Sequence, residues 1–340
     1  MSHSTNTNAT AGRDTGSLRA LIIVPVVLAT ALTIFAWPSA RLSPRDLPLG
    51  VAGPAKATQP VEQKLAQQGG AFDVRHYADE QKARNAIKDR DVYGALVPSR
   101  DGMTLLTASA ASPSVAAMLE STFAEPQPSA AAAAQQPKVE VVDVVPADSN
   151  DPHGGVFGAL VLPLVLSSVG LAVTATLFSR PGLVQGGVLV AASLLGGLVA
   201  TALVQSWLGA ISGTWIVNAG ALSLTMLAIA SVLAGARALF GWLGLGVGAA
   251  VMVLVGNAWA GISSAPEMLP KPLGLIGQLL PPGAGGNLLR STAFFDRAGA
   301  TGHMTVLVVY AALGLGAIGA AAVARRRRTA FDPALAQASA

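Results

Sequence analysis

The second half of the chain carries almost no charge. Of the 169 residues from Val156 to Ala324, only seven are Asp, Glu, Lys or Arg. Charged residues make up 12% of the 340-residue chain and hydrophobic residues 52%, whereas ordinary soluble domains are about a quarter charged. This composition excludes a disordered chain and disfavours a purely soluble fold. It predicts a membrane protein, because an apolar run of about 18 residues or more can cross a bilayer.

Six apolar runs are long enough to cross a membrane. At a rise of about 1.5 Å per residue, each covers a hydrocarbon core about 30 Å thick. Each must be helical, because lipid offers no water to satisfy an open backbone. We therefore predict an α-helical integral membrane protein with six transmembrane helices. The runs are residues 18–37, 156–178, 183–208, 215–234, 239–259 and 304–324.

Arginine residues lie at alternate junctions between these runs. With the N-terminus in the cytoplasm, every inside junction is basic, whereas the outside turn 209–214 is uncharged. The positive-inside rule thus predicts a multi-pass protein of the cell membrane, with cytoplasmic tails at residues 1–17 and 325–340. It also accounts for the pI of about 9.7 without a nucleic-acid partner. The inside arginines are Arg13, Arg19, Arg180, Arg237 and Arg325 to Arg328.

Residues 38–155, between the first two runs, have the composition of a soluble domain. They contain 11 Lys or Arg and 14 Asp or Glu. Alternating apolar residues, turn signals and caps predict the order β-α-β-α-β-β-α-β, with Asp79 and Ser112 each capping a helix. The expected fold is a small extracytoplasmic α/β domain. Residues 126–137, rich in Ala, Gln and Pro, are predicted to be a linker.

The predicted outer segment 261–302 is too long for a plain turn. The breaker Pro281–Gly286 separates two short apolar stretches, Leu273–Leu280 and Leu288–Phe295, and Asn287 is the predicted N-cap of the second. Neither stretch is long enough to span. A re-entrant hairpin inside the protein and a pair of helices lying flat on the outer leaflet both fit this pattern.

No motif predicts an enzyme, a metal site or a cofactor. The chain has no cysteine, no P-loop sequence and no histidine at ligand spacing, and its four histidines are expected on the surface. A hydrolase using Ser212 and His303 is the weakest alternative. No Asp, Glu, Lys, Arg or His lies in the interior of any predicted span, away from its ends, which disfavours ion-coupled transport. The polar Gln205, Asn218 and Asn257 are candidates for the wall of a substrate pathway, or else for bonds between helices.

The layout of one span, an external α/β domain, five further spans and a basic end resembles the type-2 ABC exporter permease family, in the branch related to phage-infection proteins. The resemblance is carried by Asp46–Gly53 (DLPLGVAG), Asp91–Pro98 (DVYGALVP) and Leu280–Phe295 (LPPGAGGNLLRSTAFF). It implies a subunit that forms a homodimer or heterodimer, pairs with a separate nucleotide-binding ATPase, and moves a hydrophobic or amphipathic molecule outward.

Under this interpretation the lipid bilayer is the other partner. The candidate outer gate element consists of Pro281, Pro282, Gly283 and Arg290. Short inside connections such as Ser179–Gly182 favour an alternative, a non-transporting scaffold or receptor that displays residues 38–155 outside the cell.

Overall fold

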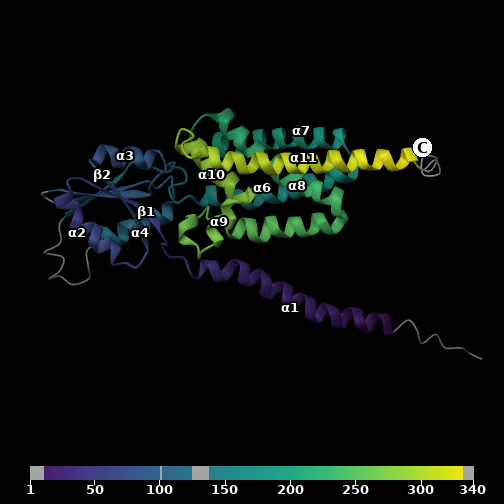
Figure 1. Cartoon of the computed structure of the whole chain (residues 1–340), viewed down its shortest axis with the longest axis horizontal. Coiled ribbons are helices and arrows are strands. Elements are labelled where there is room, and N and C mark those ends of the chain that lie inside the picture. The colour runs from purple at the N-terminus through teal and green to yellow at the C-terminus, as the bar shows by residue number, and fades with distance from the viewer. Residues whose placement is uncertain (1–10, 100–101, 125–137, 332–340) are drawn as a thin grey trace, which may run out of the picture.

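The computed structural model describes residues 11–99, 102–124 and 138–331, in an α/β domain and a helical bundle that lie end to end (Figure 1). The predicted linker 126–137 and the outer parts of both predicted tails lie outside these residues. The domain elements lie between the first and second long apolar helices of the chain.

The α/β domain has a five-stranded sheet with the strand order β2-β1-β3-β4-β5. β1 pairs in parallel with β2 and β3, β3 and β4 form an antiparallel hairpin, and β5 is parallel to β4. Leucines of β1, β3, β4 and α4 fill one core and are fully buried. The elements are β1 (Leu47–Ala52), α2 (Ala55–Ala66), β2 (Phe72–Tyr77), α3 (Glu80–Lys88), β3 (Gly94–Pro98), β4 (Gly102–Thr107), α4 (Pro113–Phe123) and β5 (Lys138–Asp143).

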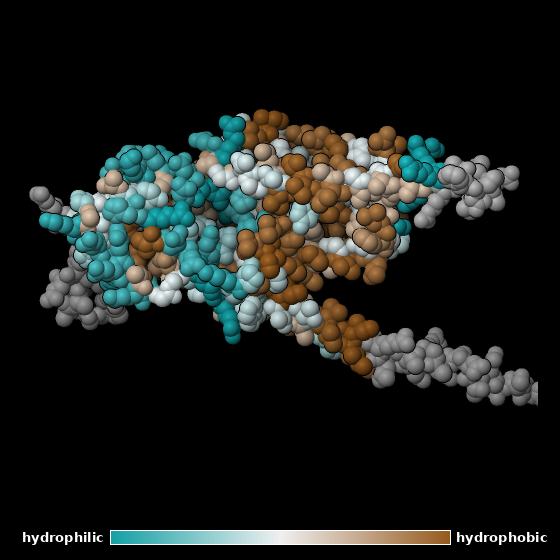
Figure 2. Space-filling view, in the orientation of Figure 1, coloured by the Kyte–Doolittle hydropathy of each residue, from teal (hydrophilic) through white to brown (hydrophobic). Residues whose placement is uncertain are grey.

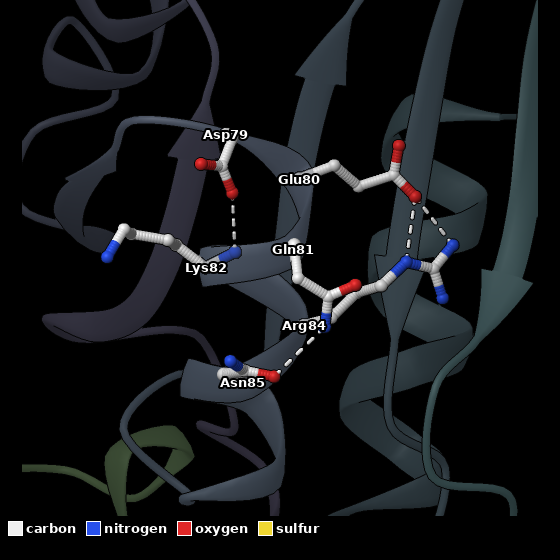
Figure 3. A network of polar contacts seen from close by, with 6 residues as sticks. All are labelled: Asp79, Glu80, Gln81, Lys82, Arg84 and Asn85. Atoms are coloured by element: carbon white, nitrogen blue, oxygen red, sulfur yellow. Dashed lines mark hydrogen bonds and ion pairs between the residues drawn. The ribbon is translucent and has the colours of Figure 1, made fainter.

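This order of strands and helices confirms the prediction, and so do both helix caps. The Asp79 side chain accepts a hydrogen bond of 2.8 Å from the backbone N–H of Lys82 at the start of α3 (Figure 3). The Ser112 hydroxyl accepts one of 3.2 Å from Val115 at the start of α4. Each cap satisfies a backbone donor that has no partner within its own helix.

Within the described residues, five helices are long and apolar enough to cross a membrane, not six. The segment 261–302 contributes three shorter helices, η3 (Pro266–Met268), α9 (Leu273–Gln278) and α10 (Pro281–Phe294). The long helices are α1 (Ala11–Ser39), α6 (Gly155–Phe178), α7 (Leu183–Thr201) with the π-helix η1 (Ala202–Trp207), α8 (Trp215–Ala250) with the π-helix η2 (Val251–Gly256), and α11 (Ala300–Phe331).

The count differs because the helical stretch 215–256 is continuous except at one residue. Gly241 has φ 71° and ψ −161°, and the chain reverses there. A Cβ on Gly248 would lie 2.8 Å from the side chain of Leu233, so the two arms lie side by side. The predicted boundary at residues 235–238 is wrong, because this stretch, including Gly235, stays helical up to Phe240. The break needs a backbone conformation that only glycine adopts readily.

Small residues hold the bundle together. A Cβ on Gly235 of α8 would lie 2.8 Å from the carbonyl oxygen of Gly314 in α11, and a Cβ on Gly314 would overlap the backbone of α8. Close backbone contact of this kind is typical of helix packing in membranes. α1 lies apart from the other helices along most of its length (Figure 1). The indole of Trp259 donates a 3.2 Å hydrogen bond to the carbonyl of Ile34 near its end.

On the face shown in Figure 2, apolar side chains cover much of the bundle and polar ones cover most of the α/β domain. Leu183 is 94% exposed and Leu243 is 76% exposed, which a soluble fold would not tolerate repeatedly. Such a surface fits hydrocarbon as its surroundings.

Candidate functional site

A cavity of about 590 Å³ lies where the α/β domain meets the bundle. Its walls come from four places: the domain with Arg90 and Tyr93, the segment from Pro266 to Gln278, Asn287 of α10, and the start of α11 with His303. The volume falls within the range of about 300–1,000 Å³ that is usual for small-molecule sites.

α10 contributes Asn287 to the wall of this cavity. Every residue from Pro281 to Ala293 is buried, so a flat position on the leaflet surface is wrong for α10. The predicted break is also wrong: the helix begins at Pro281, and Asn287 lies in its middle instead of capping it. Two prolines fit the first turn, where no N–H donor is needed. Packing then outweighs the low helix propensity of glycine, because a Cβ on Gly285 or Gly286 would overlap Thr225 or Ile262.

Arg90 reaches α10 from the end of α3. At the end of α3, the backbone N–H of Arg90 donates to the carbonyl of Ile87, and the backbone N–H of Asp91 donates to that of Ala86. This is the hydrogen-bond pattern of a Schellman motif. The residue at its turning point adopts a left-handed conformation and is usually glycine, yet Arg90 occupies it with φ 64°. Arg90 therefore occupies a position whose backbone conformation favours glycine.

The guanidinium of Arg90 binds α10 at two residues. It donates to the backbone oxygen of Asn287 at 3.1 Å, to Oδ1 of the same residue at 2.9 Å, and to the hydroxyl of Ser291. Arg290 donates to the same Oδ1 at 3.2 Å and to the carbonyl of Ile262 at 2.7 Å. One neutral oxygen thus serves two guanidinium groups.

The two arginines differ in burial but share an unusual electrostatic setting. Arg290 is buried, with its guanidinium 4.8 Å from the ring centre of Phe157, and Arg90 is partly buried. In the described part of the chain, no carboxylate lies within 4 Å of either group. Burial lowers the pKa of Arg290 to about 10 and lowers that of Arg90, but both remain protonated at pH 7.

Two carboxylates line the same cavity. Asp46 forms an ion pair with Lys271. Glu267 accepts a 2.9 Å hydrogen bond from the hydroxyl of Tyr93, whose pKa is raised by burial and then by the Glu267 charge. Arg45 donates to backbone carbonyls, including that of Met268 at 2.8 Å. Positive charge therefore predominates on the α10 side of the cavity.

None of the three candidate wall residues of the pathway lines this cavity. Asn218 is fully buried and donates to Oε1 of Gln205 at 2.9 Å and to the carbonyl of Ser212 at 2.7 Å, so these two residues bind one another. Asn257 is partly buried and follows η2 in a helical conformation. The hydrogen bond between Asn218 and Gln205 fits the alternative that these polar residues join neighbouring helices. That Gln205, Asn218 and Asn257 form the wall of a substrate pathway stays a prediction.

The predicted gate residues Pro281, Pro282, Gly283 and Arg290 are all buried at the two ends of α10. Their movement as a gate stays a prediction. Sequence reasoning missed Arg90, Tyr93 and Glu267. Glu267 had a visible signal, since it is one of seven charges in the apolar half.

His303 differs from its expected place on the surface, because the α/β domain covers the start of α11 and leaves it partly buried in the cavity wall. Ser212, the other residue of the hydrolase alternative, donates to Asp148 at 3.1 Å instead. Within the ranges that the structure describes, no three His, Asp or Glu residues form a group that could hold a metal ion. The site is suited to binding a ligand, because it combines a largely apolar cavity with the guanidinium group of Arg90 in its wall.

The fold has the layout of a multi-pass helical membrane protein, with an α/β domain between its first two candidate spans. Comparison of the chain with protein-family models, curated proteins and solved structures finds no match.

Proposed function

We propose that the chain is the membrane-spanning permease subunit of an ATP-driven exporter of the ABC type. It moves a hydrophobic or amphipathic substrate, and a separate subunit hydrolyses the ATP. The observation that carries the proposal is the cavity between the α/β domain and the bundle, beside the apolar helix α9. A chamber at the end of a bundle of apolar helices suits a cargo that leaves the membrane.

The source of energy follows from the charges. In the candidate spans as described, Arg237 lies near the reversal, and the other Lys, Arg and His lie in the first or last turns of α11. Ion-coupled transporters carry ionisable groups at the depth of the bilayer centre, so this bundle depends on a partner for energy. α11 continues as a helix through its arginines to Phe331, beyond the neighbouring helices, and offers a basic surface to such a partner (Figure 1).

The proposal includes six membrane crossings, because the two arms of residues 215–256 each cross once. Both termini then lie in the cytoplasm of the cell, and the α/β domain lies outside the cell membrane. The chain has no cysteine, so single cysteines report the topology directly. We expect Thr122→Cys to react with a membrane-impermeant maleimide in intact cells, and Ala324→Cys to react only after the membrane is opened. The reverse pattern would overturn the proposed orientation.

Copurification from the native host tests the function itself. We expect the full chain to retain a nucleotide-binding subunit, and we expect glutamine at residues 325–327 to release it. The control carries glutamine at Arg75 and Arg84 in the α/β domain and keeps the partner. Recovery of the wild-type chain without any nucleotide-binding subunit would contradict the proposal.

A scaffold or receptor is the second candidate, favoured by the short connections at the end away from the domain. Ser179–Gly182 joins α6 to α7, and Gly241 alone joins the two arms of α8. Deleting residues 45–145 separates the two functions, because a scaffold then loses all activity. Transport that survives the deletion would exclude the scaffold.

A further inference from the structure

The wall of the cavity combines a cationic side chain with an exposed apolar one. Arg90 lines it beside Asn287 of α10, to which Arg290 also donates. Leu275 of α9 lines it too and is 65% exposed at the surface of the bundle. Leu279, one turn further along, is 54% exposed. The cavity therefore extends from a cationic wall to an apolar edge that faces outward.

Arg90 has donors to spare. A guanidinium carries five N–H groups, and the described protein atoms accept three of them, two on Asn287 and one on Ser291. The Nε–H and one Nη2–H remain for a ligand. A guanidinium that is partly removed from water and has no carboxylate within 4 Å favours a bound anion, and its fork suits phosphate or carboxylate oxygens.

The carboxylates of the cavity do not neutralise this wall. Lys271 pairs with Asp46, and Glu267 accepts the Tyr93 hydrogen bond and is a single charge against Arg90 and Arg290. The backbone conformation adds an independent argument. Position 90 favours glycine, so the guanidinium is present against the preference of its own turn.

We propose that this cavity binds an amphipathic molecule with an anionic head, a phosphate or a carboxylate, held by Arg90, and with an apolar body directed along α9. Asn287 and Ser291 act as positioning residues, since they fix the guanidinium. This inference rests on the proposed export function for its biological meaning, because it specifies the substrate class. Binding itself needs no ATPase, so it is measured separately from transport.

The test uses the purified full-length chain in nanodiscs of phosphatidylcholine. The probes are phosphatidic acid and a fatty acid, each with a fluorophore on the acyl chain, together with a cationic probe, an alkylamine bearing the same fluorophore. We expect saturable binding of at least one anionic probe and weaker binding of the amine. A preference for phosphatidic acid assigns the head as phosphate, and a preference for the fatty acid assigns it as carboxylate.

Arg90→Gly is the decisive variant, because it keeps the turn and removes the guanidinium. We expect the affinity for the preferred anionic probe to fall at least tenfold in Arg90→Gly and to recover in part in Arg90→Lys. The matched control is Arg84→Gln on the same helix, whose guanidinium pairs with Glu80 outside the cavity (Figure 3) and should leave affinity unchanged. Unchanged affinity in Arg90→Gly, stronger binding of the amine, or no saturable binding of either anion would overturn the inference.

Discussion

The two ends of the helical bundle use arginine in opposite ways. At the end near the α/β domain, Arg90 and Arg290 donate to neutral oxygens beside a cavity of about 590 Å³. At the far end, Arg237 stacks on Trp242 at 4.5 Å, beside a pocket of about 90 Å³. Position 90 at the domain end and position 241 at the far end both have positive φ, but the first is an arginine and the second a glycine.

The comparison shows that position 241 depends on the conformation of its backbone, whereas position 90 depends on its side chain. At Gly241 the backbone decides, since φ 71° with ψ −161° is open almost only to glycine. At Arg90 the side chain decides, because a left-handed residue would be easier as glycine. At the far end, the glycine allows the chain to reverse. At the domain end, the arginine supplies a guanidinium that binds α10.

The largest effect should come from Gly241→Val, which forces a branched side chain into the reversal. We expect a loss of about 3 kcal/mol of unfolding free energy, because the strained backbone cannot relax without separating the two arms. The measurement is thermal unfolding of the purified full-length chain in detergent. Gly246→Val is the control, since a Cβ there meets nothing within 4 Å. Equal stability of the two variants would refute the reversal at Gly241.

Arg290→Met tests the buried charge at the domain end. We expect destabilisation of about 2 kcal/mol, because the carbonyl of Ile262 loses a charged donor, even though repulsion from Arg90 is relieved. Chemical unfolding in detergent, followed by tryptophan fluorescence, measures it. Arg237→Met, at the partly exposed far end, should cost less than about 1 kcal/mol. A more stable Arg290→Met would show that repulsion outweighs the hydrogen bonds.

A smaller effect should separate the backbone of position 90 from its side chain. We expect Arg90→Gly to be more stable than Arg90→Ala by about 1 kcal/mol, since alanine keeps the left-handed strain. At Lys88, inside the last turn of α3, the order reverses, with glycine less stable by about 1 kcal/mol. Paired thermal melts of the four variants test this. The same order at both positions would mean that Arg90 is unstrained.

The smallest effect is expected at the surface of α3. The ion pair of Arg84 with Glu80 is partly exposed, so Arg84→Gln should cost no more than about 0.5 kcal/mol and less in high salt. Melts at low and high ionic strength measure this value. A cost as large as that of Arg290→Met would erase the distinction between a surface arginine and a buried one.

The α/β domain could be predicted from sequence because its signals are local. Strand β1 over Leu47–Ala52, the cap at Asp79 and the Ser112–Pro113 helix start depend on neighbouring residues alone. α10 could not be predicted in this way. Its Pro-Pro-Gly-Ala-Gly-Gly start is a breaker in isolation. It is helical where α10 is buried in the bundle, and its glycines allow close contact with Thr225 and Ile262.

The cavity was missed for a related reason. Arg90 and Asn287 are 197 positions apart in the chain, and their pairing depends on how the domain lies on the bundle. The apolar runs were visible, but the reversal at Gly241 depends on backbone angles that one glycine among many does not reveal.

The shared oxygen of Asn287 has a mechanical consequence. Arg90 belongs to the domain and Arg290 to the bundle, yet both are attached to one amide. If the domain moves by a few ångströms relative to α10, Asn287 cannot keep its hydrogen bonds to both Arg90 and Arg290, because hydrogen bonds weaken steeply beyond about 3.2 Å. The domain must therefore either carry α10 along as one rigid body or break the Arg90 bonds to Asn287 and Ser291 together with the Tyr93–Glu267 bond. Movement of the α/β domain and movement of α10 are thus coupled through these side chains.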